Sequence, residues 1–115
     1  MRSTLRAGEE VMTAYYKDVD RYPLLSPSEE RQLVLRSARG DRRATDKLVQ
    51  SNLRFVIHVA RGFQSHGLPL ADLINEGNLG LITAARKFDP AKEVRFITYA
   101  VWWIRQNIKL SLIHI

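Results

Sequence analysis

Apolar residues recur at helical spacing along almost the whole chain, and this periodicity constrains the fold more than any other feature. The clearest run is residues 96–109, read at about 100° per residue, the angular advance of an α-helix. One side of this segment carries only apolar residues, namely Phe96, Ala100, Trp103, Ile104 and Ile108. Convincing two-residue alternation, the pattern of a half-buried strand, is absent. The sequence therefore predicts an all-α fold, a compact bundle of about five helices.

Length and composition fit a single helical domain spanning residues 1–115. A chain of 115 residues can bury a modest core, and its 45% hydrophobic content is ordinary for a globular protein. The sequence shows no repeat, low-complexity run or linker. The final SLIHI segment closes on an apolar residue without Gly, Pro or a polar tail, so we expect a domain truncated at its C-terminus.

Capping signals set the predicted boundaries of the first helices. Residues 5–20 form the first predicted helix, which ends at Tyr22-Pro23. Ser26, Pro27 and Glu29 have the pattern of a capping box with proline at the first helical position, so a second helix begins there. It ends near Gly40, a residue type that commonly terminates helices. Asp41 then caps the next helix.

Three further helices complete the prediction. Residues 42–64 carry a broad apolar stripe and form the predicted central core helix, and a loop follows over 64–69. Residues 70–87 form a fourth helix, and the fifth starts near residue 93. Gly77 and Gly80 lie inside the fourth helix, where each costs roughly 1 kcal/mol relative to Ala. Glycines kept at such a cost indicate close approach, either by a neighbouring helix or by a partner.

The polar side of segment 96–109 contains an unexpected aromatic residue. Trp102 falls among Arg105, Gln106 and Lys109, with Tyr99 at the edge of that side. An exposed indole beside cations fits a nucleic-acid base stacked on a ring, or a protein pocket that takes an aromatic anchor. The alternative is that both tryptophans belong to the core.

The charge balance favours an acidic partner. The net charge is +6, and residues 54–115 carry eight Lys and Arg against four Asp and Glu.

With no cysteine, disulfides and thiolate chemistry are excluded. The three histidines lack the spacing of a zinc site, and no glycine-rich phosphate loop follows a strand. We therefore expect no enzyme activity, metal or cofactor. Because the sequence shows neither an apolar run of membrane length nor a signal peptide, we expect no membrane association and a cytoplasmic location.

Three segments of the chain are similar to one known family. SNLRFVIHVAR, DLINEGNLGLITAARKFDP and RFITYAVWWIRQNI closely resemble the second conserved region of bacterial sigma factors of the sigma-70 family, primary-like branch. YYKDVDRYPLLSPSEE is similar to the short region, 1.2, that precedes it. The resemblance covers about residues 14–110. It implies a helical domain that binds core RNA polymerase and melts the minus-ten element of a promoter.

The resemblance also implies a role for individual residues in DNA binding. Tyr99 would stack on the flipped adenine of the nontemplate strand, in a pocket that Phe88, Asp89 and Lys92 help to line. Trp102 and Trp103 would form the wedge at the upstream fork. Gln106 and Lys109 would face the first duplex position. Arg95 and Thr98 would hold phosphate of the nontemplate strand. A second flipped base, a thymine, would enter a pocket built from Asn52, Leu24 and Glu30.

The same resemblance implies a surface for the polymerase on the fourth helix. Its members, which would contact the clamp helices of the largest subunit, are Asp72, Asn75, Glu76, Asn78 and Ile82. The sequence departs from the family pattern at two positions. Val94 stands where relatives often have an aromatic residue, and Ile97 stands where they commonly have a small polar one. A second hypothesis remains open, in which the aromatic face docks an anti-sigma factor or another regulator and DNA contact is secondary.

Overall fold

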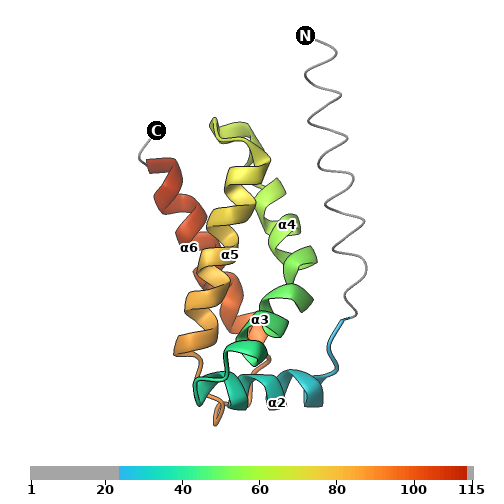
Figure 1. The fold of residues 1–115 in the computed structure, drawn as a ribbon. Coiled ribbons are helices and arrows are strands. Elements are labelled where there is room, and N and C mark those ends of the chain that lie inside the picture. The colour runs from blue at the N-terminus through green and yellow to red at the C-terminus, as the bar shows by residue number, and fades with distance from the viewer. Residues whose placement is uncertain (1–23, 114–115) are drawn as a thin grey trace.

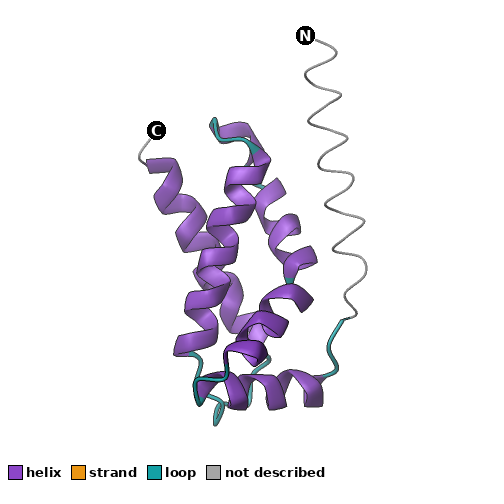
Figure 2. Cartoon of the chain, viewed as in Figure 1, coloured by secondary structure: helices purple, strands orange, loops and turns teal. Residues whose placement is uncertain are grey.

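The computed structural model describes residues 24–113, which form five α-helices, α2 to α6, and no strand. Their bounds are α2 Pro27–Ala38, α3 Arg42–Ser51, α4 Leu53–Arg61, α5 Leu70–Lys87 and α6 Phe96–Ile113, with a short 3-10 helix, η1, at Gln64–His66. The prediction of an all-α fold is confirmed (Figure 2). The helix predicted over residues 5–20 and the turn at Tyr22-Pro23 lie outside the described residues.

Local capping chemistry fixes the start of α2 and α3 as the sequence predicts. The Ser26 hydroxyl accepts from the backbone N–H of Glu29 at 3.2 Å, and the Glu29 carboxylate accepts from the backbone N–H of Ser26 at 3.3 Å. The chain leaves α2 through Gly40, whose φ of 90° suits a residue without a Cβ. Asp41 then accepts from the backbone N–H of Ala44 at 3.2 Å and caps α3.

The single helix predicted over residues 42–64 is wrong, because the chain breaks at Asn52. This residue has φ −109° and ψ 7° and separates α3 from α4. Its side-chain amide donates to the carbonyl of Leu48 at 2.7 Å. Asparagine bonds readily to nearby backbone groups and so competes with helix continuation. The break gives α3 and α4 separate directions and leaves Asn52 at the junction.

Helix α5 is the centre of the described bundle, a place that we had predicted for segment 42–64. It packs against α2, α3, α4 and α6. Helix α2 lies across one end of the bundle, roughly perpendicular to the long axis of α5 (Figure 1). Its bounds match the prediction, and its buried side includes Leu73, Ile74, Leu81 and Ala85. The core of the domain therefore surrounds α5 and is closed on one side by Ala100, Ile104 and Ile108 of α6 and their neighbours.

The two glycines inside α5 serve helix packing. A Cβ atom added to Gly80 would lie 2.8 Å from the carbonyl carbon of Trp103 and 2.9 Å from Cα of Ile104. One added to Gly77 would lie 2.7 Å from Cγ1 of Val56 on α4. Both glycines are buried, so the neighbouring helices α4 and α6, rather than a partner, make the close approach that the sequence indicated.

Candidate nucleic-acid interface

The outward side of α6 presents a tryptophan among polar and cationic residues. Trp102 is 56% exposed, as its place on the predicted helix indicated. Arg105 and Lys109 are exposed on the same side of α6, and Gln106 is half-buried beside them. Thr98 is exposed one turn before Trp102. The indole therefore carries apolar surface that a partner would cover.

A continuous series of ring contacts supports Trp102 from within the domain. Its ring centroid lies 4.9 Å from that of Trp103, with the two planes at 87°. Trp103 in turn lies 6.4 Å from Tyr99, which lies 5.2 Å from Phe88. Phe88 meets the buried ring of Phe96 edge-on at 5.5 Å. Because edge-to-face pairs hold rings in defined orientations, the exposed indole stands on a preorganised base.

A lysine that the sequence prediction did not assign lies over one of these rings. Nζ of Lys87, at the end of α5, lies 5.2 Å from the ring centroid of Trp103 on α6, within cation–π range. Nε1 of Trp103 is buried and has no hydrogen-bond partner in the described part of the chain. The two residues belong to different helices, so only the tertiary structure reveals the contact.

The four residues expected around the flipped adenine lie near the end of α5, the following loop and the first turn of α6. Tyr99 is half-buried against Phe88, which is itself buried in the core. Asp89 is exposed, and its carboxylate accepts from the backbone N–H of Ala91 at 2.9 Å, which shapes the loop between α5 and α6. Lys92 and Phe88 line a pocket of about 390 Å³ between this loop and α2, and neither Asp89 nor Tyr99 reaches it.

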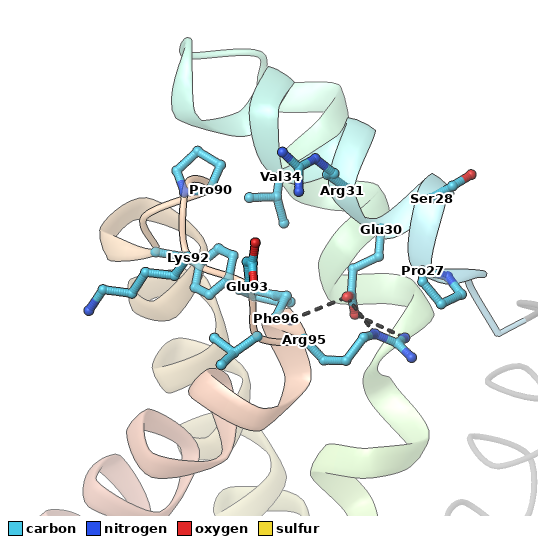
Figure 3. A pocket seen from close by; sticks show the side chains of 12 residues that line it. Pro27, Ser28, Glu30, Arg31, Val34, Pro90, Lys92, Glu93, Arg95 and Phe96 are labelled. Atoms are coloured by element: carbon cyan, nitrogen blue, oxygen red, sulfur yellow. Dashed lines mark hydrogen bonds and ion pairs between the residues drawn. The ribbon is translucent and has the colours of Figure 1, made fainter.

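A buried carboxylate joins α2 to the first turn of α6 (Figure 3). Glu30 is only 4% exposed, and its Oε2 accepts from Nε of Arg95 at 2.8 Å and from the backbone N–H of Phe96 at 3.2 Å. Its Oε1 accepts from Nη2 of Arg95 at 3.3 Å. The hydrogen bond with Glu30 raises the pKa of Arg95 above its usual value. Glu30 thus caps α6, and it holds the guanidinium in one orientation at the surface.

Three residues implied by the resemblance do meet in one pocket. Leu24, Glu30 and Asn52 line a pocket of about 280 Å³, which we call the Asn52 pocket; the rest of its lining is Leu25, Ser51, Phe55, Arg95 and Ile97. The lining comes from α2 and the residues just before it, from the α3–α4 junction and α4, and from the start of α6 and the residue before it. The break at Asn52 and the bond between Glu30 and Arg95 therefore both shape its wall, and neither was predicted from the sequence.

One face of α5 gathers the residues expected to contact the polymerase. Asp72 and Asn75 are exposed, and the other three are half-buried, namely Glu76, Asn78 and Ile82. Leu79 is 53% exposed on the same helix. It lies seven residues after Asp72 and three before Ile82, spacings that place it on this face. A helical projection of the sequence would have found Leu79, which our prediction omitted.

Two other kinds of site are absent from residues 24–113. No cluster of three or more histidine or acidic side chains there is arranged to hold a metal ion. None of the helices in this range combines the length and apolarity of a membrane span.

The fold and these residues define the described part of the chain as an all-α domain that offers aromatic rings and cations on one surface. Rings together with cations are the features by which many proteins hold single-stranded nucleic acid. Residues 48–112 match the family described as Sigma-70 region 2. The chain belongs to this family.

Curated relatives agree with the family match. The chain is 44% identical over 107 residues to the RNA polymerase sigma factor RpoH of Rhizobium radiobacter, covering 92% of this chain and 36% of that protein. It is 48% identical over 106 residues to the RNA polymerase sigma factor SigA of Clostridium acetobutylicum, covering 92% of this chain and 28% of that protein. The chain thus spans about a third of the length of these relatives.

Proposed function

We propose that this chain is the sigma-factor domain that directs RNA polymerase to promoters and opens the minus-ten element by capturing bases of the nontemplate strand. The observation that carries the proposal is the exposed Trp102, supported edge-on by Trp103 and flanked by Arg105 and Lys109. Rings stack on bases whatever their sequence, and cations hold the backbone. Stacking is worth about 1–3 kcal/mol per base, so several rings together offset the opening of a base pair.

Individual roles follow the family positions and the geometry. Trp102 and Trp103 act as the wedge at the fork, and Tyr99 stacks on the first flipped base, an adenine. The Asn52 pocket, lined also by Leu24 and Glu30, takes the second flipped base, a thymine. The volume of this pocket, about 280 Å³, accommodates a single base. Phe88 acts by supporting Tyr99 from the core, while Asp89 and Lys92 shape and charge the adjoining loop.

The remaining DNA contacts lie on α6. Gln106 and Lys109 face the first duplex position, because they continue the side of α6 that carries Trp102. Thr98 and Arg95 hold strand phosphate between the two captured bases. Glu30 occupies one edge of the Arg95 guanidinium, and the arginine side chain remains 47% exposed, so surface is left for an anion.

The α5 face binds the clamp helices of the largest polymerase subunit. Leu79 supplies apolar area at its centre, and the polar members Asp72, Asn75, Glu76 and Asn78 form its rim with Ile82. An apolar centre with a polar rim is the usual anatomy of a protein–protein interface.

Binding to short oligonucleotides tests the DNA proposal. The chain, together with the clamp-helix fragment, is titrated into a fluorescent single strand carrying the minus-ten nontemplate sequence, and into a scrambled strand of the same composition. The proposal predicts tighter binding to the minus-ten strand. Equal binding of both strands would contradict it.

The exposed rings also fit the second hypothesis, docking of an anti-sigma factor or another protein regulator. Salt dependence separates the two. Binding through several phosphates weakens steeply as salt rises, because counterions are released from the DNA. Docking on an apolar anchor changes much less.

A further inference from the structure

The polar side of the Asn52 pocket is largely engaged within the protein itself. The carboxylate of Glu30 accepts from Nε and Nη2 of Arg95 and from the backbone N–H of Phe96. These bonds fill three of the roughly four acceptor positions of a carboxylate. The side-chain amide of Asn52 already donates to the carbonyl of Leu48 at 2.7 Å. Little capacity therefore remains for hydrogen bonds that would identify a base.

The polar atoms that remain do not separate one pyrimidine from another. An asparagine amide offers both a donor and an acceptor, and the hydroxyl of Ser51 acts as either. The Watson–Crick edges of thymine and cytosine each carry a donor and an acceptor, so these groups can pair with both bases. Arg95 only donates, and the O2 carbonyl that would accept from it is common to thymine, uracil and cytosine. A choice among pyrimidines must come from the apolar side of the pocket.

Four apolar residues form that side, namely Leu24, Leu25, Phe55 and Ile97. Leu24 precedes α2 and is 72% exposed, whereas Ile97 is half-buried in the first turn of α6. Ile97 directly follows Phe96, whose backbone N–H is bound by the buried Glu30 (Figure 3). Its β-branched side chain also has few rotamers. Ile97 therefore presents apolar surface to the pocket at a fixed place.

The part of a pyrimidine that suits such a surface is a methyl group at C5. Apolar side chains contact the thymine methyl group in duplex DNA, and the group lies away from the Watson–Crick edge. Uracil has the edge of thymine without the methyl group, and 5-methylcytosine has the methyl group on a different edge. The two properties can therefore be separated by the choice of base.

We infer that Ile97 makes the Asn52 pocket a site for 5-methylpyrimidines, which recognises the methyl group rather than the Watson–Crick edge. The inference rests on the proposed function and specifies what the second captured base must carry. It also gives a role to a position at which this chain departs from the family pattern, because a small polar residue would not supply the same apolar contact.

Binding of strands that differ only at the second captured base tests the inference. This base is thymine, uracil, 5-methylcytosine or cytosine in an otherwise identical minus-ten strand, and the clamp-helix fragment is present throughout. The wild-type chain should bind the methylated member of each pair about four- to tenfold more tightly, the effect of one methyl group in an apolar site. The same exchanges at a base outside the minus-ten element should change the affinity little.

Variants of α6 assign the preference to one side chain. Ile97→Ser should lose most of the methyl preference, and Ile97→Val should keep most of it. Val101→Ala is the matched control, since Val101 is another half-buried β-branched residue of α6 and does not line the pocket. The preference is a ratio of affinities measured on one chain, so a general change in affinity cancels. Thermal unfolding confirms that each variant is folded, and Ile97→Ala replaces Ile97→Ser if the latter is not.

Three results would overturn the inference. One is equal binding of the thymine and uracil strands by the wild-type chain. Another is tight binding of both of these strands and weak binding of both cytosine strands, which would show that the edge is recognised. The third is a methyl preference that persists in Ile97→Ser. Equal binding of the minus-ten and scrambled strands contradicts the proposed function instead, and a methyl preference that Ile97→Ser removes would still support the pocket.

Discussion

Glu30 and Arg95 form a buried-to-surface ion pair that locks the first turn of α6 onto α2. The carboxylate of Glu30 is nearly inaccessible, accepts from Nε of Arg95 at 2.8 Å, and also bonds the backbone N–H of Phe96. Because α6 carries Trp102 and Tyr99, this pair sets where the rings stand relative to the Asn52 pocket. In the proposed function, the same contact would also orient Arg95 for strand phosphate.

Replacing Glu30 should therefore cost stability. Glu30→Ala leaves the Phe96 N–H without its acceptor and Arg95 without its partner, and we expect a loss of about 1–3 kcal/mol. Because the Arg95 side chain is half-exposed, solvent weakens the ion pair and the expected loss stays within this range. Glu30→Gln retains an acceptor and should cost less than Glu30→Ala. Urea unfolding measures both, and an alanine variant as stable as wild type would contradict the assigned contact.

The approach of α5 to α6 at Gly80 predicts a second effect on stability. Gly80→Ala places a methyl group against the backbone of Trp103 and Ile104, which cannot move as a flexible side chain does. Overpacking of this kind costs about 1–3 kcal/mol and should also shift Trp103. Gly40→Ala is the comparison, since nothing lies within 4 Å of its added Cβ and only backbone strain at φ 90° remains. A Gly80→Ala chain that unfolds at the wild-type urea concentration would show that the helices are less closely packed.

Acid should destabilise the capped helices. Hydrogen bonds with Ser26 lower the pKa of Glu29, and the hydrogen bond from Arg36 lowers that of Asp41. Each carboxylate has a lower pKa in the folded state than in the unfolded state. Its contribution to stability is therefore complete above the unfolded pKa, 4.5 for Glu29 and 3.8 for Asp41, and is lost as pH falls through the folded pKa. Thermal unfolding should show a midpoint that is flat near neutral pH and falls below about pH 4. The unfolding midpoint of the Asp41→Asn variant should fall less steeply with decreasing pH. A pH dependence equal to that of wild type would refute the role of Asp41.

The exposed Leu79 predicts a specific loss of polymerase binding. Leu79→Gln removes apolar area from the α5 face without touching the core, so we expect an unchanged unfolding midpoint and an affinity for the clamp-helix fragment about tenfold weaker. Leu110→Gln is a matched control, because Leu110 is 55% exposed but lies on α6. Equal affinities of the two variants would place the interface elsewhere.

Patterns that depend on neighbouring residues could be predicted from the sequence. The capping box at Ser26, the cap at Asp41, the bounds of α5 and the exposure of Trp102 all follow from local spacing, and the structure confirms them. The break at Asn52 was missed because the apolar stripe continues across it, while a single side-chain bond to Leu48 interrupts the helix.

Contacts between distant residues could not be predicted in this way. Glu30 and Arg95 are separated by most of the described chain, and Lys87 meets Trp103 only because α5 and α6 lie side by side. The family likeness associates Leu24, Glu30 and Asn52, which are distant in sequence, and these three residues line one pocket. Of the residues associated with the adenine, Phe88 lies in the core and the Asp89 carboxylate accepts from the backbone N–H of Ala91 in its own loop.

The central claim, that Trp102 is held outward to stack on a parted DNA strand, is tested most directly by its own fluorescence. The chain has two tryptophans, so Trp103→Phe makes Trp102 the sole emitter, and the buried N–H that it removes has no partner among the described residues. With the clamp-helix fragment replaced by a version free of tryptophan, the emission is followed during titration with the minus-ten nontemplate strand. We predict saturable quenching that follows the binding curve and is weaker with the scrambled strand. Binding detected by anisotropy with unchanged Trp102 emission would contradict the account.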